Sequence, residues 1–341
     1  MNLDEFNQKL EEYGKPKSGG YSSQIRCTAS ETEAGITLAV ELLNPKEAFS
    51  GADVWGIAML EEMKRSLPLE ALSGKKFTLR FIADPNEKSD CLPQYYEELK
   101  RRLSYLAAVN KDVDFLLEKG PGQEDALYTM DQMIRLAQNG ETVQHDEIGS
   151  HEEENKPGRL EKDFQTYLYG EKDPQKGWYT NKRLVLLGED FSSDEKKEAR
   201  LEREFPTGSF KGESNNANRI LPTRHVDFIT QNKHGDLAVI ELKVPDSSKL
   251  EDIAQITDYA LYFCVYKQEL AAILEKNYGF KGVEDRGIVS YLASNAFHKR
   301  FDDIWPYYVG NRDANNREWI HLKQVVMGYY KPAKAALQAL P

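Results

Sequence analysis

Three charged side chains in the second half of the chain are spaced so that they can act together. Asp227 precedes Glu241 by fourteen residues, and Lys243 follows Glu241 by two. Two carboxylates supply hard oxygen ligands that suit Mg²⁺ or Mn²⁺, ions that keep several waters and bind phosphates. A lysine beside them can orient or deprotonate a metal-bound water, or stabilise negative charge on a phosphate oxygen. This spacing therefore predicts metal-assisted chemistry at a phosphate group.

A hairpin is expected to bring the two carboxylates to one edge of a sheet. Residues 226–229 favour a strand, residues 231–236 favour a turn, and residues 237–244 alternate with period two. One face of the second strand is apolar, whereas the other carries Glu241 and Lys243. Charges at the end of an apolar strand are costly unless they are paired or used. The alternative interpretation is an exposed pair with no chemical role.

The helix expected after this hairpin adds two polar side chains. Gln255 and Tyr259 are four residues apart, so they lie on one helix face. Together with the Asp…Glu-x-Lys pattern of the hairpin, this Gln-x-x-x-Tyr helix resembles the PD-(D/E)xK nuclease superfamily and, within it, the RecB-type members. One departure is Val226, which stands where the name of the superfamily has proline.

A third acid precedes the expected sheet. Residues 160–168 carry a helical apolar stripe, and Glu161 and Gln165 flank that stripe on one side. Enzymes of the superfamily often place a further acid on the helix before the core sheet. The pattern Glu-x-x-Phe-Gln, then an expected strand at 184–187, then the hairpin, looks like the Shedu-type phage-defence nucleases over roughly residues 159–265. An ordinary, partly buried helix acid is the alternative for Glu161.

This resemblance implies a Mg²⁺- or Mn²⁺-dependent deoxyribonuclease that hydrolyses phosphodiester bonds, in phage defence or DNA processing. The site would consist of Asp227, Glu241, Lys243, Glu161, Gln255 and Tyr259. The three acids would hold the metal ion. The lysine would position the water and stabilise the developing negative charge, and the glutamine and tyrosine would orient the water or the strand.

Two rival interpretations stay open. The first is a non-catalytic module that keeps the nuclease fold to bind nucleic acid or protein, although an intact Asp/Glu/Lys set argues against such decay. The second is a coincidental pattern in a metabolic enzyme or an interaction protein. The sequence has no glycine-rich phosphate loop, no Ser-His-Asp order and no zinc-ligand spacing to support the second.

Composition favours a cytoplasmic globular protein. The 341 residues are enough for two domains. The three cysteines are scattered and odd in number, as expected in a reducing compartment. The chain begins with an acidic amphipathic stretch rather than a signal peptide, and no apolar run approaches the length of a membrane span.

The net charge of −11 weighs against nucleic acid as the substrate, because phosphate backbones attract basic surfaces. The acid is unevenly distributed, however. Residues 141–154 contain six carboxylates and no Lys or Arg, whereas residues 281–341 contain nine Lys or Arg against six acids. A local basic groove is therefore compatible with the sequence. DNA is the expected partner, no membrane is expected, and a homo-oligomer is left open.

The charge pattern also predicts a domain boundary. Residues 1–140 read as an α/β or α+β unit for recognition or regulation, residues 141–158 as an acidic linker, and residues 159–341 as a nuclease-like α/β domain with a mixed sheet flanked by helices. The linker is expected to be protease-sensitive, and residues 155–341 are expected to fold alone.

Secondary structure is expected as follows: helices at 3–12, 52–66, 93–109 and 125–139, strands at 36–42, 77–82 and 112–118, a charged helix-like run at 193–204 inside a long loop, and a last helix at 319–330. In that loop, Arg219 and Arg224 could reach phosphates, and simple surface exposure is the alternative.

Overall fold

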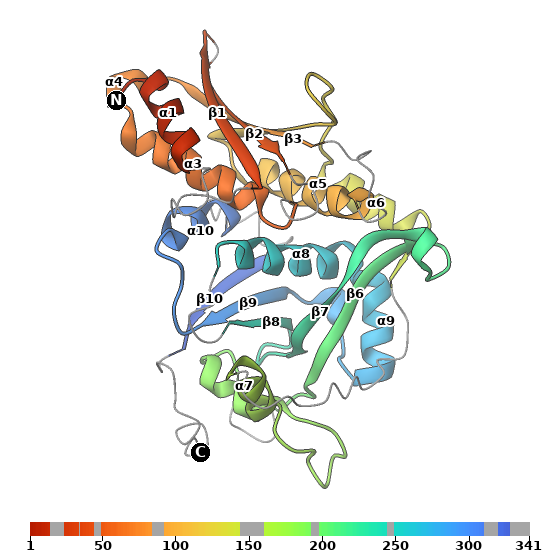
Figure 1. Ribbon diagram of the computed structural model, residues 1–341. Helices are drawn as coiled ribbons and strands as arrows, with labels where there is room; N and C mark the ends of the chain where they lie inside the picture. Colours follow the sequence, from red (N-terminus) through yellow and green to blue (C-terminus); the bar gives the residue numbers. More distant parts are fainter. Residues whose placement is uncertain are drawn as a thin grey trace.

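The chain folds as an α/β protein with two mixed, open sheets of four and six strands flanked by helices (Figure 1). The computed structural model describes residues 1–13, 24–33, 35–43, 49–83, 92–143, 160–191, 198–243, 249–309 and 320–327. The expected α/β class with a mixed, helix-flanked sheet is confirmed. Within the described residues, no helix combines the length and the apolar character needed to cross a membrane.

The four-stranded sheet belongs to the N-terminal part of the chain. Its order is β1 (Ile25–Thr32), β2 (Gly35–Leu42), β3 (Lys76–Ile82) and β4 (Val113–Glu118). The first pair is antiparallel and the others are parallel, because helical crossovers connect β2 to β3 and β3 to β4. The helices of this part are α1 (Leu3–Tyr13), α3 (Ala52–Ser66), α4 (Leu69–Leu72), α5 (Leu92–Val109) and α6 (Met130–Gln138).

The six-stranded sheet carries the predicted hairpin. Its order is β10 (His321–Val326), β9 (Ile288–Ser294), β8 (Leu237–Lys243), β7 (Arg219–Gln231), β6 (Glu202–Lys211) and β5 (Glu141–Val143). Strands β8, β9 and β10 are parallel, and the pairs from β8 to β5 are antiparallel. In Figure 1, α8 (Glu251–Val265) lies on one side of this sheet and α7 (Leu160–Tyr169) on the other. The remaining helices are α9 (Lys267–Tyr278), α10 (Phe301–Val309) and the short 3-10 helices η1 (Asn181–Leu187), η3 (Asn216–Asn218) and η4 (Val283–Asp285).

Three local expectations from the sequence are wrong. The strand expected at 184–187 is part of the 3-10 helix η1. The long polar loop instead contains β6 and the start of β7, so the helix-like run at 193–204 ends in a strand, while its residues 193–197 lie outside the described part. The segment 319–330, expected as the last helix, contains strand β10, which pairs parallel with β9. Leu322 of β10 is buried, whereas His321 and Gln324 are exposed.

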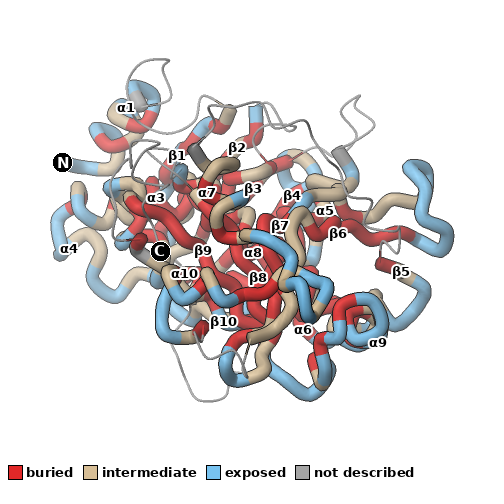
Figure 2. The backbone as a smooth tube through the Cα atoms, turned by 90° about the horizontal axis from the view of Figure 1, so that it is seen from below, coloured by how far each residue is buried: buried red, intermediate tan, exposed pale blue. Residues whose placement is uncertain are grey.

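Buried apolar residues form two clusters on opposite faces of the six-stranded sheet. One is continuous from the N-terminal sheet and its helices into α8, α9 and α10, and the other fills the space between the sheet, α7 and η1. Strand β8 lies between them, with Val239 in the first cluster and Ile240 in the second. Both faces of the strand are therefore buried, and Figure 2 shows this buried centre surrounded by exposed segments.

A buried ionic cluster joins the N-terminal part to α8. The fully buried Arg102 of α5 donates to both oxygens of Asp53 (3.1 and 3.0 Å), to both oxygens of Asp258 (2.8 and 2.7 Å) and to the carbonyl of Phe49 (2.6 Å). The hydroxyl of Tyr308 donates to Asp53 at 2.6 Å. Because guanidinium donors are matched to carboxylate oxygens here, the charges compensate one another away from water.

The predicted linker begins inside the sheet. Glu141–Val143 forms β5 and pairs with β6, whereas residues 144–158 lie outside the described part. The first apolar cluster also crosses the predicted boundary. Independent folding of residues 155–341 stays a prediction, and the shared core works against it, because removing the N-terminal part would expose apolar surface on α8.

Candidate active site

Asp227 and Glu241 face each other at the point where β7 and β8 separate. The antiparallel pairing runs from Gln231 with Leu237 to Phe228 with Ile240, so the next pair in register is Asp227 with Glu241. The two carboxylates are thus on adjacent strands, as expected from the hairpin. Beyond them, β8 pairs with β9 alone among the described residues. The backbone N–H of Leu242 donates to Oδ2 of Asp227 at 2.6 Å.

The ladder is also interrupted on the other side of Asp227. Pairing between β6 and β7 includes Arg203 with Phe228 and Phe205 with Val226, and it omits the pair between them, Glu204 with Asp227. Glu204 has a φ of +51°, the left-handed region that L-residues other than glycine rarely adopt. Among the described residues, Glu204 alone combines a positive φ with a side chain. Backbone strain of this kind is characteristic of functional sites.

Glu241 has one oxygen fully engaged and one without a partner. Its Oε1 accepts from Nζ of Lys243 at 2.7 Å and from Nε2 of Gln255 at 2.8 Å. Its Oε2 is buried and, within the described residues, accepts no hydrogen bond. An unpaired carboxylate oxygen in a buried place costs free energy that a cation could offset. This oxygen is the observation that best fits a bound metal ion.

Asp227 is held from two directions. In addition to the bond from Leu242, its Oδ1 accepts from Nε2 of Gln165, which lies on α7. A carboxylate has about four lone-pair positions, so both oxygens can still accept another ligand. Asp227 and Glu241 therefore offer oxygen atoms of the type that a divalent cation binds.

Burial raises the pKa of both acids. Burial, followed by the charge of Glu241, raises the pKa of Asp227 well above its usual range. Burial raises the pKa of Glu241 to about 7, although the charge and hydrogen bond of Lys243 lower it. Burial alone would lower the pKa of Lys243, but the charges of Glu241 and Asp252 raise it above its ordinary value. The lysine is therefore a cation here.

The predicted Gln-x-x-x-Tyr pair lies on the face of α8 that meets this site. Gln255 donates both to Glu241 and to the hydroxyl of Tyr259, the latter at 3.0 Å. The Tyr259 hydroxyl in turn donates to the backbone carbonyl of His225 at 2.9 Å. Burial, then the charge of Glu241, raises the pKa of Tyr259 well above its usual value, so the phenol stays neutral. Tyr259 positions Gln255 and is shielded from solvent.

Glu161 approaches the site without completing a ligand set. It lies on α7 one turn before Gln165, and its charge raises the pKa of both Asp227 and Glu241. Yet no group of three or more His, Cys, Asp or Glu side chains within the described residues is arranged to hold a metal ion. The structure thus links Glu241, Lys243, Gln255 and Tyr259 by hydrogen bonds. The charges of Asp227 and Glu161 act on this group as well.

Two residues of this site were not assigned a role from the sequence. Gln165 donates a hydrogen bond to Asp227. Its position four residues after Glu161, on the same helix face, is the sequence feature that could have predicted a place in the site. Asp252 lies three residues before Gln255, and burial raises its pKa to about 6, although the charge of Lys243 lowers it. Its Oδ2 accepts from the backbone N–H of Lys249 at 2.7 Å.

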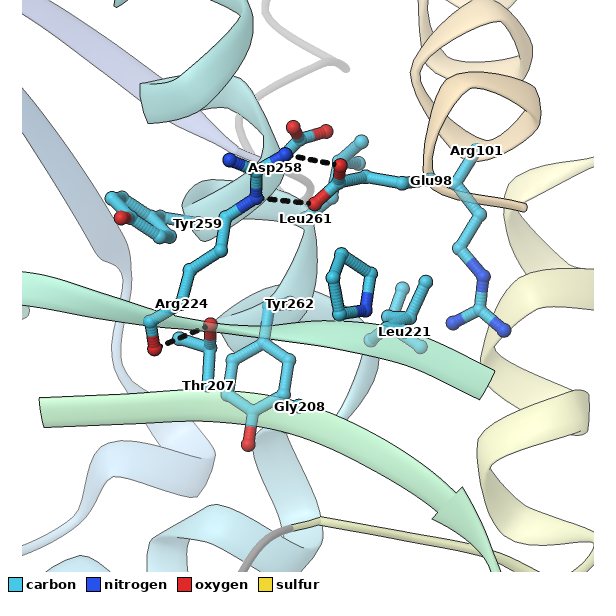
Figure 3. A pocket seen from close by; sticks show the side chains of 12 residues that line it. Glu98, Arg101, Thr207, Gly208, Leu221, Arg224, Asp258, Tyr259, Leu261 and Tyr262 are labelled. Carbon is cyan, nitrogen blue, oxygen red and sulfur yellow. Dashed lines mark hydrogen bonds and ion pairs between the residues drawn. The ribbon is translucent and has the colours of Figure 1, made fainter. Parts of the chain in front are cut away.

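Behind Tyr259, a cavity of about 20 Å³ marks the contact between α5, β6, β7 and α8. It is large enough for about one water molecule. Figure 3 shows Arg224 on this side, donating to both oxygens of Glu98 at 2.9 and 2.6 Å. Since Arg224 is engaged by Glu98, it does not reach a phosphate at the candidate site. Arg219 is held by Thr223 and Asn216.

The site can perform one kind of chemistry well. Two adjacent acids can bind a hard cation, and a fixed lysine cation can neutralise charge that develops beside it. Gln255 can hold the carboxylate in place because Tyr259 fixes its orientation.

In comparisons with known proteins, no family model and no curated protein matches this sequence.

Proposed function

We propose that this protein is a Mg²⁺- or Mn²⁺-dependent nuclease that hydrolyses phosphodiester bonds in DNA. The observation that carries this proposal is the buried Glu241 carboxylate, whose Oε2 has no partner within the described residues while Oε1 is fixed by Lys243 and Gln255. The adjacent Asp227 supplies a second oxygen ligand. The resemblance of the hairpin and following helix to PD-(D/E)xK enzymes of the RecB type supports the same conclusion.

Each residue has a definite task in this proposal. Asp227 and Glu241 would hold the ion, which would lower the pKa of a bound water and polarise the phosphate. Lys243 stabilises the extra negative charge at phosphorus and lies next to the ligand Glu241. Gln255 holds Glu241, and Gln165 holds Asp227. Glu161 would join as a ligand if α7 moved toward the hairpin.

A role in phage defence is the finer part of the proposal. It rests on the Glu-x-x-Phe-Gln pattern of α7 followed by the hairpin, which resembles Shedu-type nucleases. The intervening segment is the 3-10 helix η1 instead of the expected strand, so the likeness rests on α7 and the hairpin.

A non-catalytic binding module is the second candidate. Both oxygens of Asp227 already accept hydrogen bonds, from Leu242 and Gln165, and no three-ligand group is arranged within the described residues. Such an arrangement would fit a binding protein in which these side chains stabilise the fold and do not bind a metal ion.

A cleavage assay separates the two candidates. Supercoiled and linear DNA are incubated with the full chain and Mg²⁺, Mn²⁺ or EDTA, and Glu241→Gln is compared with the exposed control Glu284→Gln. We expect metal-dependent cleavage by the wild type and the control, and none by Glu241→Gln. Equal behaviour of all three proteins, together with no effect of Mn²⁺ on the melting temperature, would leave only the binding module.

A further inference from the structure

An aromatic surface with cations on its rings borders the candidate site. We call it the aromatic strip; it consists of Tyr167, Tyr169, Lys172, Trp178, Tyr179, Arg183 and Arg203. The rings of Tyr169 and Tyr179 stack with centroids 3.7 Å apart. The Arg203 guanidinium lies 4.9 Å from the Tyr169 centroid, and the Lys172 ammonium lies 5.7 Å from that of Tyr179.

The strip begins within one helical turn of the hairpin acids. Tyr169 follows Gln165 by four residues on α7, and Gln165 is bonded to Asp227. The Tyr169 ring also stacks at 6.3 Å on Phe228, the residue after Asp227. A nucleic-acid strand that is bound at the hairpin and runs toward α7 would therefore cross this surface.

The cations of the strip are held by rings rather than by acids. Lys172, Arg183 and Arg203 form no ion pair with a carboxylate anywhere in the described part of the chain. Arg183 instead donates to the backbone carbonyl of Tyr167 at 2.6 Å and lies 4.8 Å from the ring centroid of the same residue. Two acids of the same region are already paired, Glu202 with Arg200 and Asp173 with Lys176. Positive charge fixed on aromatic faces is thus available to an anionic ligand.

The charge of this region favours an unpaired strand over a duplex. Residues 160–191 contain five Lys or Arg and six Asp or Glu. Duplex binding depends chiefly on neutralising many phosphates, and this surface has no excess of positive charge with which to do so. An unpaired strand can in addition stack its bases on aromatic side chains, and Trp178, with 40% of its surface exposed, is placed to receive one.

We propose that the aromatic strip binds single-stranded nucleic acid beside the candidate active site, with a base stacked on the exposed ring of Trp178 and phosphates contacting Lys172, Arg183 and Arg203. This inference rests on the proposed nuclease function, because it names the strand that the site would receive. The substrate class is then DNA with an unpaired segment.

Binding is measured with the full chain carrying Glu241→Gln, so that cleavage does not interfere. Fluorescence anisotropy of a labelled single-stranded oligonucleotide is compared with that of the duplex of the same sequence. Trp178→Ala and Arg203→Gln are added to this background. The matched controls are Leu69→Ala, an exposed apolar residue of α4, and Arg26→Gln, an exposed cation of β1.

We expect the parent protein to bind the single strand more tightly than the duplex, and Trp178→Ala to weaken single-strand binding roughly tenfold, as loss of one stacked base does. Arg203→Gln should also weaken it and reduce its salt dependence, whereas both controls should not change it. Tighter binding of the duplex, or equal single-strand affinity of parent, strip variants and controls, would overturn the inference.

The failure of this inference differs from that of the proposed function. Metal-dependent cleavage by the wild type that is unaffected by the strip variants would refute the strip and leave the nuclease. Strip-dependent binding of the single strand without any cleavage by the wild type would support the strip and refute the nuclease.

Discussion

Replacing Glu241 by Gln tests the electrostatics of the site in the absence of any ion. The side chain is buried, and its pKa of about 7 lies well above its ordinary value of 4.5. The native state therefore binds this proton more tightly than the unfolded state does. As the pH rises from 4.5 to 7, the free energy of unfolding falls, because ionised Glu241 is less stable in the native site than in water.

The size of this effect follows from the pKa shift. One pKa unit corresponds to about 1.4 kcal/mol. The raised pKa of Glu241 therefore destabilises the native state by about 3 kcal/mol at about pH 8, where the side chain must ionise, and by less than about 1 kcal/mol at about pH 5, where it stays protonated in the native state. Gln has nearly the same volume and no charge. Glu241→Gln should therefore be more stable than the wild type by about 3 kcal/mol at about pH 8, and nearly equal to it at about pH 5.

Urea unfolding of both proteins at the two pH values measures this difference. The control is Glu284→Gln, a substitution at an exposed residue, whose free energy of unfolding should stay within about 0.5 kcal/mol of the wild-type value at both pH values. Mn²⁺ added at about one hundred times its dissociation constant should stabilise the wild type by about 2.7 kcal/mol and leave Glu241→Gln unchanged. If Glu241→Gln is instead less stable than the wild type at about pH 8, the contact with Lys243 is a structural salt bridge and the metal site is refuted.

Three further predictions concern neighbouring residues. Lys243→Ala should keep the Mn²⁺-induced rise in melting temperature but lose plasmid cleavage, since lysine is not a ligand; retained cleavage would contradict its role. Arg102→Met should lower the free energy of unfolding by about 3–5 kcal/mol, because it leaves Asp258 buried without its partner. If urea denaturation shows a decrease of less than about 1 kcal/mol, the buried ionic cluster is not needed for stability. Glu204→Gly should raise the free energy of unfolding by about 0.5 kcal/mol, as glycine adopts the φ of +51° without strain; a decrease would mean that the Glu204 side chain itself stabilises the strand.

The hairpin and the helix after it could be predicted because their signals are local. Residues 237–243 form a short, mostly apolar run that favours a strand, and Gly235 lies in the turn with a φ of +82°, where an L-side chain would be strained. Gln255 and Tyr259 share a helix face whatever the rest of the chain does. These local patterns are therefore sufficient to predict that Glu241, Gln255 and Tyr259 lie near one another.

Strand β6 could not be predicted in this way, because Pro206 and Gly208 are typical of a loop. In the structure Pro206 lies beyond the three residues of β5, where β6 is an edge of the sheet within the described part, and an edge strand is where proline is tolerated. Gly208 coincides with a shift in register between Thr207 and Ser209. Both residues are tolerated for reasons that depend on neighbouring strands.

Long-range polar contacts were likewise hidden. Asp258 is 156 residues from Arg102 in the sequence, and no local pattern links them. Strand β10 was mistaken for a helix because its pairing with β9 is non-local.

Helix α8 has a consequence for recombination between proteins of this architecture. Consecutive helical residues point about 100° apart, so Asp258 faces Arg102 of the N-terminal part while Tyr259, next to it, faces the hairpin. A chimera that took its first 140 residues from a homologue lacking an arginine at position 102 would bury the Asp258 carboxylate without its counter-ion. The two parts would therefore be inherited together, or Asp258 would have to change in the same step.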